Sequence, residues 1–119
     1  PVDLQDVAAT AAIVLCEPGH RGATYELCGS EVLTQSEQAA IISAEMGCRV
    51  RAEKTDLDEW TRRARANGLR GYALDALLKM FHYYDQYGFW GNAHMLHALL
   101  GRQPTSYAAF VKRMLHEKK

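Results

Sequence analysis

The stretch at positions 72–87 constrains the fold most, because its spacing predicts a helix that is apolar on two sides. A surface helix of a globular protein presents one apolar face to the core, so a helix with two such faces needs cover on both. The first stripe contains Leu74, Leu77, Leu78, Phe81 and Tyr84, and the second contains Ala73, Ala76, Met80, Tyr83 and Tyr87. The chain continues into YYDQYGFWGN at 83–92, where Phe89 and Trp90 add two more rings. The first stripe fits an ordinary core, whereas the second is left to face something else.

Capping signals in the first half of the chain predict two further helices. Asp3 has the character of an N-cap, and the apolar residues after it recur at helical spacing. We expect the inward face of this first helix to contain Leu4, Val7, Ala8, Ala11, Val14 and Leu15. Thr34 with Glu37 three residues later forms a capping box, and Gly47 is a natural end for the helix that follows.

Similar signals predict three more helices in the second half. A helix is expected to open at Thr55 and Asp58, before the two-sided helix. Asn92 is the predicted cap of a short helix that ends at Gly101, and Pro104-Thr105 is predicted to open the last helix. Together with the two-sided helix, these segments give about six helices.

Two short segments read as strands, because they alternate along the chain and one of them is rich in β-forming residues. They are ATYEL at 23–27 and CRVRAEK at 48–54. No linker or internal repeat divides the sequence, so we expect a single domain over 1–119. The predicted fold class is therefore α+β, mostly α, with about six helices and two short strands.

The distribution of charge narrows the range of partners. The net charge is zero, but residues 1–60 carry 11 acidic and 4 basic side chains, whereas residues 61–119 carry 3 and 10. We expect the two halves to fold against each other. The basic residues are scattered and show no arginine–aromatic reader pattern, so no nucleic-acid partner is expected.

Hydropathy and cysteine usage indicate the compartment. No apolar run approaches the length of a membrane span, and no secretory signal opens the sequence, so no membrane partner is expected and the predicted location is cytoplasmic. The odd number of cysteines, with no C-x-x-C spacing, predicts that Cys16, Cys28 and Cys48 are buried, reduced thiols.

No catalytic constellation is visible. The sequence contains no G-x-S-x-G, no phosphate-binding P-loop and no G-x-G-x-x-G. His94 and His97 stand three residues apart, but a metal site needs a third and a fourth ligand, and none is at a telling spacing. We therefore predict no catalytic residue, no metal site and no cofactor site within this chain.

The candidate site is the aromatic cluster instead. Its residues are Met80, Tyr83, Tyr87, Phe89 and Trp90. Tyrosine and tryptophan combine an apolar body with a polar tip, which suits the wall of a pocket or an interface. The competing interpretation is that these side chains belong to an ordinary core. However, the helix already packs its first stripe against the core, and the second stripe lies on another side. We predict that the five residues bind substrate.

Three stretches resemble the C-terminal half of NmrA-like proteins, which are atypical short-chain dehydrogenases/reductases. The family has a D-V-A helix, matched by Asp6-Val7-Ala8. It then has a pattern G-x-x-Y-x-L-x-G-x-E-x-L-T, matched here by Gly22, Tyr25, Leu27, Gly29, Leu33 and Thr34. LLGRQPTSYAAFV at 99–111 is similar to the family's closing L-G-R-x-P-T-x-x-x-F-V.

This resemblance implies the substrate-side lobe of an NAD(P)-dependent reductase or redox-sensing regulator, without its nucleotide-binding Rossmann half. It implies NAD(P) for a full-length relative and no catalysis by this chain alone. The occupant of the surface formed by the aromatic cluster would be the missing nucleotide-binding domain, a second copy in a homo-oligomer, or a small apolar ligand. The alternative function is a stand-alone, cofactor-free module that binds a small molecule or another protein.

Overall fold

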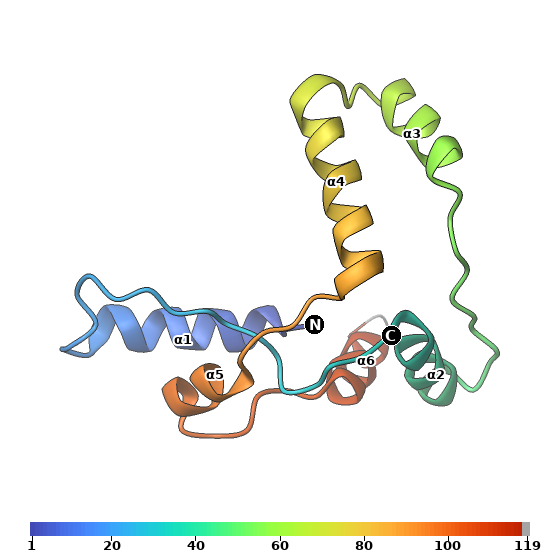
Figure 1. The fold of residues 1–119 in the computed structure, drawn as a ribbon. Helices are drawn as coiled ribbons and strands as arrows, with labels where there is room; N and C mark the ends of the chain where they lie inside the picture. The colour runs from blue at the N-terminus through green and yellow to red at the C-terminus, as the bar shows by residue number, and fades with distance from the viewer. Residues whose placement is uncertain (118–119) are drawn as a thin grey trace. The chain divides into compact units, whose positions relative to one another are not determined.

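A computed structural model describes residues 1–117, and within that range the chain forms six helices and no strand. The helices are α1 Leu4–Cys16, α2 Gln35–Met46, α3 Leu57–Ala66, α4 Gly71–Tyr87, α5 Ala93–Leu100 and α6 Tyr107–His116 (Figure 1). The predicted number of helices is confirmed for these residues. None of the helices is both long and apolar enough to span a membrane within the part of the chain described.

The helices separate into two compact units. The four-helix unit comprises residues 1–52 and the residues from 91 onward, with α1, α2, α5 and α6. Within it, α1 packs against α5 and α2 packs against α6 (Figure 1). The two-helix unit is Glu53–Trp90, in which α3 packs against α4.

Local capping sets the helix boundaries, as the sequence predicts at several positions. The Asp3 carboxylate accepts a hydrogen bond from Gln5 N–H at 3.0 Å and caps α1. At α2, Glu37 N–H donates to Thr34 Oγ1 at 3.2 Å, and Thr34 N–H donates to Glu37 Oε2 at 2.7 Å, which completes the capping box. Gly47 ends α2 in the left-handed conformation that glycine adopts without strain.

Two predicted helix starts are wrong by one or two residues. The cap of α3 is Asp56, whose Oδ1 accepts from Glu59 N–H at 2.9 Å, and not Thr55 or Asp58. The cap of α6 is Ser106, whose Oγ accepts from Ala109 N–H at 3.2 Å, and not Pro104-Thr105. In both cases the side chain that reaches the N–H three residues ahead defines the start.

The two predicted strands are also wrong: neither 23–27 nor 48–54 forms a strand in the described chain. A strand exists only through backbone hydrogen bonds to a second extended segment, and none of residues 1–117 supplies that partner. At Val50 a side chain takes the place of a partner strand, because the Val50 N–H donates to Ser43 Oγ at 2.9 Å. Ser43 in turn donates to the Ala39 carbonyl oxygen at 2.8 Å.

The orientation of α1 is the reverse of the predicted one for several residues. Leu4 and Leu15 are 78% and 84% exposed, whereas Asp6 and Thr10 are 0% and 2% exposed. Ala8 and Ala11, predicted to point inward, are exposed as well. The reason is that Asp6 bonds to Arg102 and Thr105 on the inner side of the helix. The helix therefore turns its polar face inward and leaves an apolar face in solvent.

Helix α4 buries the first of its two stripes. Leu74 is 3% exposed, Leu77 and Leu78 are half-buried, and the Phe81 ring meets the Trp60 ring edge-on with centroids 4.9 Å apart. Tyr84, at the end of this stripe, is exposed. The first stripe therefore forms the α3–α4 contact, and the second stripe is available to form a site.

Candidate functional site

The five predicted site residues lie at the C-terminal end of α4 and just beyond it. Met80 is half-buried, and the other four are exposed. The exposed fractions are 58% for Tyr83, 56% for Tyr87, and 70% for both Phe89 and Trp90. We call these five residues the aromatic face. Water-exposed rings in such density are unusual for a monomer.

Ring contacts join Tyr87, Tyr83, Tyr84 and Phe89 in one series, with Tyr83 and Tyr84 edge-on at 6.2 Å between centroids. Tyr83 and Tyr87, one turn apart on α4, place their ring centroids 4.8 Å apart. Phe89 turns back to Tyr84, with centroids 4.9 Å apart. Tyr84 was assigned to the core stripe, yet it is 37% exposed and joins Phe89, so it belongs with the site. Its contact with Phe89 follows from the chain reversal after α4, which no helical spacing signals.

Gly88 fixes the position of Trp90. It ends α4 with φ of +70°, in the region that disfavours a side chain, and a Cβ there would lie 2.8 Å from Trp90 Nε1. The indole N–H donates to the Tyr87 carbonyl oxygen at 3.0 Å. This hydrogen bond holds the indole against the end of the helix and leaves most of its surface open.

The aromatic face presents ring surfaces and two phenol hydroxyls to solvent. Its polar atoms are the phenol hydroxyls of Tyr83 and Tyr87, which can donate to a carbonyl oxygen of a ligand. Offset or edge-on ring contacts contribute about 0.5–1.5 kcal/mol each beyond area burial. The arrangement suits a flat, conjugated compound, and it lacks a paired acid and base.

A second cluster was missed from the sequence: carboxylates at the start of the chain bind groups near its end. The Asp6 carboxylate accepts from Arg102 Nη2 and from Thr105 N–H, both at 2.6 Å. Asp3 pairs with Arg113 at 2.8 Å. We call Asp3, Asp6, Arg102, Thr105 and Arg113 the carboxylate clasp. It joins α1 to α6 and to the loop before it through two ion pairs, Asp6–Arg102 and Asp3–Arg113.

The clasp shifts the ionisation of its carboxyl groups. The hydrogen bond from Arg113 lowers the pKa of Asp3 below its ordinary value. Burial by itself raises the pKa of Asp6, but the hydrogen bonds from Thr105 and Arg102 outweigh it, so that pKa is lowered as well. Both groups are therefore held as carboxylates. A single aspartate inside a D-V-A helix gave no signal of this role, because its partners lie 96 and 99 residues away.

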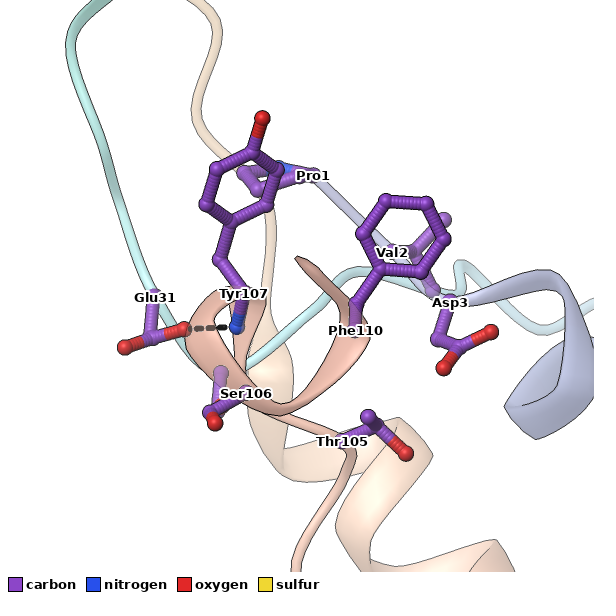
Figure 2. A pocket seen from close by; sticks show the side chains of 9 residues that line it. Pro1, Val2, Asp3, Glu31, Thr105, Ser106, Tyr107 and Phe110 are labelled. Carbon is purple, nitrogen blue, oxygen red and sulfur yellow. Dashed lines mark hydrogen bonds between the residues drawn. The ribbon is translucent and has the colours of Figure 1, made fainter. Parts of the chain in front are cut away.

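A small hollow lies beside the clasp, with a volume of about 60 Å³. Figure 2 shows the rings of Tyr107 and Phe110 beside Pro1 and Val2, and Glu31 accepting a hydrogen bond from Tyr107 N–H. A Cβ on Gly29 would collide with the Pro1 carbonyl oxygen, so a residue without a side chain is needed there. The hollow has room for a few solvent molecules, not for a substrate.

The cysteines differ from the sequence-based expectation. Cys16 and Cys48 are exposed and Cys28 is half-buried, so the prediction of buried thiols is wrong for Cys16 and Cys48 and only partly met at Cys28. Burial and the neighbouring Glu26 carboxylate raise the pKa of Cys28. All three are free thiols, and no group of three or more histidine, cysteine or carboxylate side chains gathers at one point within residues 1–117.

The chain's own residues do not fit a dinucleotide. A pyrophosphate is held by a glycine-rich turn and the free N–H groups of a helix N-terminus. Here the side chains of Asp3, Thr34, Asp56, Asn92 and Ser106 already cap five of the helices, and only α4, which follows Arg70, lacks a side-chain cap. The sequence also lacks a glycine-rich turn of the required pattern.

The chain is similar to parts of several reductases. It is 27% identical to an NAD(P)H azoreductase of Xenophilus azovorans over 111 residues, which cover 93% of this chain and 39% of the relative. The same figures hold for quinone oxidoreductase 2 of Escherichia coli. A (4-alkanoyl-5-oxo-2,5-dihydrofuran-3-yl)methyl phosphate reductase of Streptomyces griseus is 40% identical over 57 residues, 48% of this chain and 20% of that protein.

A solved structure extends this likeness to the fold. An NADPH-dependent quinone oxidoreductase from Escherichia coli superimposes with a TM-score of 0.71 and 27% identity, over 92% of this chain and 40% of that one. The chain thus spans about two fifths of the length of the relatives that it matches over nearly all its residues. No family model matches the chain.

Proposed function

We propose that this chain is the substrate-side lobe of an NmrA-like NAD(P)H-dependent reductase, or of a redox-sensing relative, and that it is not catalytic alone. The aromatic face carries this proposal. It is exposed in a chain that matches reductases along 93% of its own residues but only 39% of theirs. Such a surface has a role if a nucleotide-binding part of a longer protein stands opposite and a substrate lies between them.

The composition of the face favours flat, conjugated substrates. The relatives are named for azo compounds and for quinones, which share a planar π-system. The rings of Tyr83, Tyr87 and Trp90 provide surfaces for stacking, and the two phenols provide donors for a carbonyl oxygen. In this role the chain would bind and orient the acceptor, while the nicotinamide ring and its hydride would come from the part of the protein that holds NAD(P).

The exposed side of α1, in the four-helix unit, also supports the proposal that this chain is part of a longer protein. Leu4 and Leu15 stand out from the helix with Ala8 and Ala11 between them, all exposed. An apolar stripe with small residues at its centre permits close packing against another surface. We propose that the remainder of a longer protein covers it.

The test is binding of a planar quinone, menadione, to the 119-residue chain, followed at the Trp90 indole N–H by NMR. Replacing both Tyr87→Ser and Trp90→Gln removes that reporter, so affinity in the variant is measured by calorimetry. We expect saturable binding that falls at least about tenfold in the variant, since two stacking surfaces are lost.

Tyr72→Ser is the matched control, because Tyr72 is 88% exposed on the same helix but lies outside the aromatic face. It should leave quinone affinity unchanged. NADPH should show no saturable binding below about 1 mM, because no phosphate-binding turn is present. Equal quinone binding by the double variant, or micromolar NADPH binding by the chain, would refute the proposal.

A second copy of the chain is the alternative occupant of the aromatic face. One self-complementary patch closes with two copies, so a symmetric homodimer would cover it. Sedimentation of the chain should then show a dimer that the Tyr87→Ser, Trp90→Gln variant shifts toward monomer. A clean monomer at high micromolar concentration excludes this alternative. Intact-mass analysis of the native protein separates a lobe of a longer reductase from a stand-alone module.

A further inference from the structure

An open hollow in the two-helix unit has no place in the proposed function. It has a volume of about 440 Å³ and is lined by Thr55, Trp60, Arg63, Ala64, Asn67 and Leu69. All six residues belong to Glu53–Trp90. None of them belongs to the aromatic face, so the hollow is a separate feature. Its size falls in the range of about 300–1,000 Å³ that is typical of small-molecule sites.

The lining divides into an apolar part and a polar part. Trp60, Ala64 and Leu69 are half-buried and contribute carbon surface, and the Trp60 ring also packs edge-on with Phe81. Thr55 and Asn67 contribute a hydroxyl and an amide, and neither side chain hydrogen-bonds to another residue in the part of the chain described. A ligand with a flat apolar body and a polar end would meet both parts.

The charge at this end of α3 is positive. Arg62, Arg63 and Arg65 stand in its second half, Arg70 follows in the loop, and no acidic residue occurs between Glu59 and Asp75. Arg63 uses one guanidinium nitrogen on Glu59, at 2.9 Å, and is 65% exposed at its side chain, so its other donors face solvent. Basic residues at a helix C-terminus also stabilise the helix dipole, which accounts for their presence but not for the hollow.

We propose that this hollow binds an aromatic carboxylate. The ring would lie against Trp60, Ala64 and Leu69, and the carboxylate would accept hydrogen bonds from Arg63, with Thr55 and Asn67 as further donors. A guanidinium holds a carboxylate through a charge-assisted hydrogen bond, about twice as strong as a neutral one. The site stands independently of the aromatic face, because it shares no residue with it.

The test uses 2-naphthoate as the probe and the 119-residue chain, observed by NMR at the Trp60 indole N–H and the Asn67 side-chain amide. We expect both signals to shift in a saturable way, with a Kd of about 0.1–1 mM, as a shallow open site allows. The neutral analogue 2-naphthalenemethanol has the same rings and should bind at least about fivefold more weakly, because it lacks the charge.

Arg63→Gln should weaken 2-naphthoate binding at least about fivefold. Arg62→Gln is the matched control, since Arg62 neighbours Arg63 on α3 but does not line the hollow. It should leave the affinity within about twofold, the spread that non-contact surface charges produce. The Arg63–Glu59 pair is an exposed i,i+4 pair worth about 0.3–0.5 kcal/mol, so its loss should leave the fold intact.

Three outcomes would overturn the proposal. Equal affinity for the neutral analogue would show that charge plays no part. Equal weakening by Arg62→Gln and Arg63→Gln would show a diffuse electrostatic effect without a defined site. Shifts at the Trp90 indole in place of Trp60 would place the probe on the aromatic face. Quinone binding at Trp90 tests the proposed function separately, so either result can fail alone.

Discussion

The two units of the chain are held together by different kinds of interaction. In the four-helix unit, Asp6 reaches Arg102 and Thr105 across nearly the whole sequence, through directional contacts of 2.6 Å. In the two-helix unit, α3 and α4 are neighbours in sequence and meet through Leu74 and the Trp60–Phe81 ring contact. The four-helix unit adds these polar contacts between distant residues to an apolar core that includes Leu96 and Val111, whereas the two-helix unit depends on apolar packing between adjacent helices.

The two kinds of interaction stabilise their units to different degrees. A buried carboxylate with defined donors fixes a single arrangement, but it contributes less net stability than its short distances suggest, because both charges lose hydration. A helix pair with one fully buried leucine has a small core, and helices of this length are marginal without tertiary cover. We infer that the two-helix unit, which carries both candidate binding surfaces, opens more readily than the four-helix unit.

The largest expected effect is from Asp6→Ala, which tests whether the clasp closes the four-helix unit. The change leaves Thr105 N–H without its acceptor and Arg102 without its partner, so we expect a loss of about 3 kcal/mol in unfolding free energy. Urea denaturation followed by circular dichroism measures it. Glu45→Ala, at an exposed position on α2, is the control. A loss of unfolding free energy no greater than the control's would show that the clasp does not stabilise the four-helix unit.

Leu74→Ala should have the next largest effect and should act on the other unit. Removing a side chain that is 3% exposed costs about 2 kcal/mol here, because half-buried neighbours can partly fill the space. Hydrogen exchange should speed up in α3 and α4 and stay unchanged in α1 and α6. Tyr72→Ala, on the same helix but exposed, should change little. Equal acceleration in all helices would mean that the units unfold as one.

Acid should weaken the four-helix unit by a smaller and graded amount. The pKa values of Asp3 and Asp6 are lower in the folded chain than their ordinary value of 3.8, so the unfolded chain binds more protons in that range. Their contribution is complete above the ordinary value and is lost as the pH falls through the lowered ones. Unfolding free energy measured from pH 5 to pH 2 should fall more steeply in the chain than in an Asp3→Asn, Asp6→Asn variant. Parallel profiles would contradict this.

The helices were predictable because their signals are local. The cap at Asp3, the capping box of Thr34 and Glu37, and the end at Gly47 involve groups two to four residues apart, which one window of sequence contains. The aromatic face was likewise predicted from spacing on a single helix, and its exposure agrees with a second stripe left outside the α3–α4 contact. Its role in binding substrate stays a prediction.

Only the tertiary structure decided which side of α1 faces inward and whether alternating segments become strands. Apolar spacing placed Leu4 and Leu15 inside, but Asp6 faces inward to partners near the other end of the chain, while both leucines are exposed. Segments 23–27 and 48–54 alternate as strands do, yet a strand needs a second strand that residues 1–117 do not provide. Local sequence thus determined the helices, because their hydrogen bonds close within the helix, while long-range partners determined the buried faces.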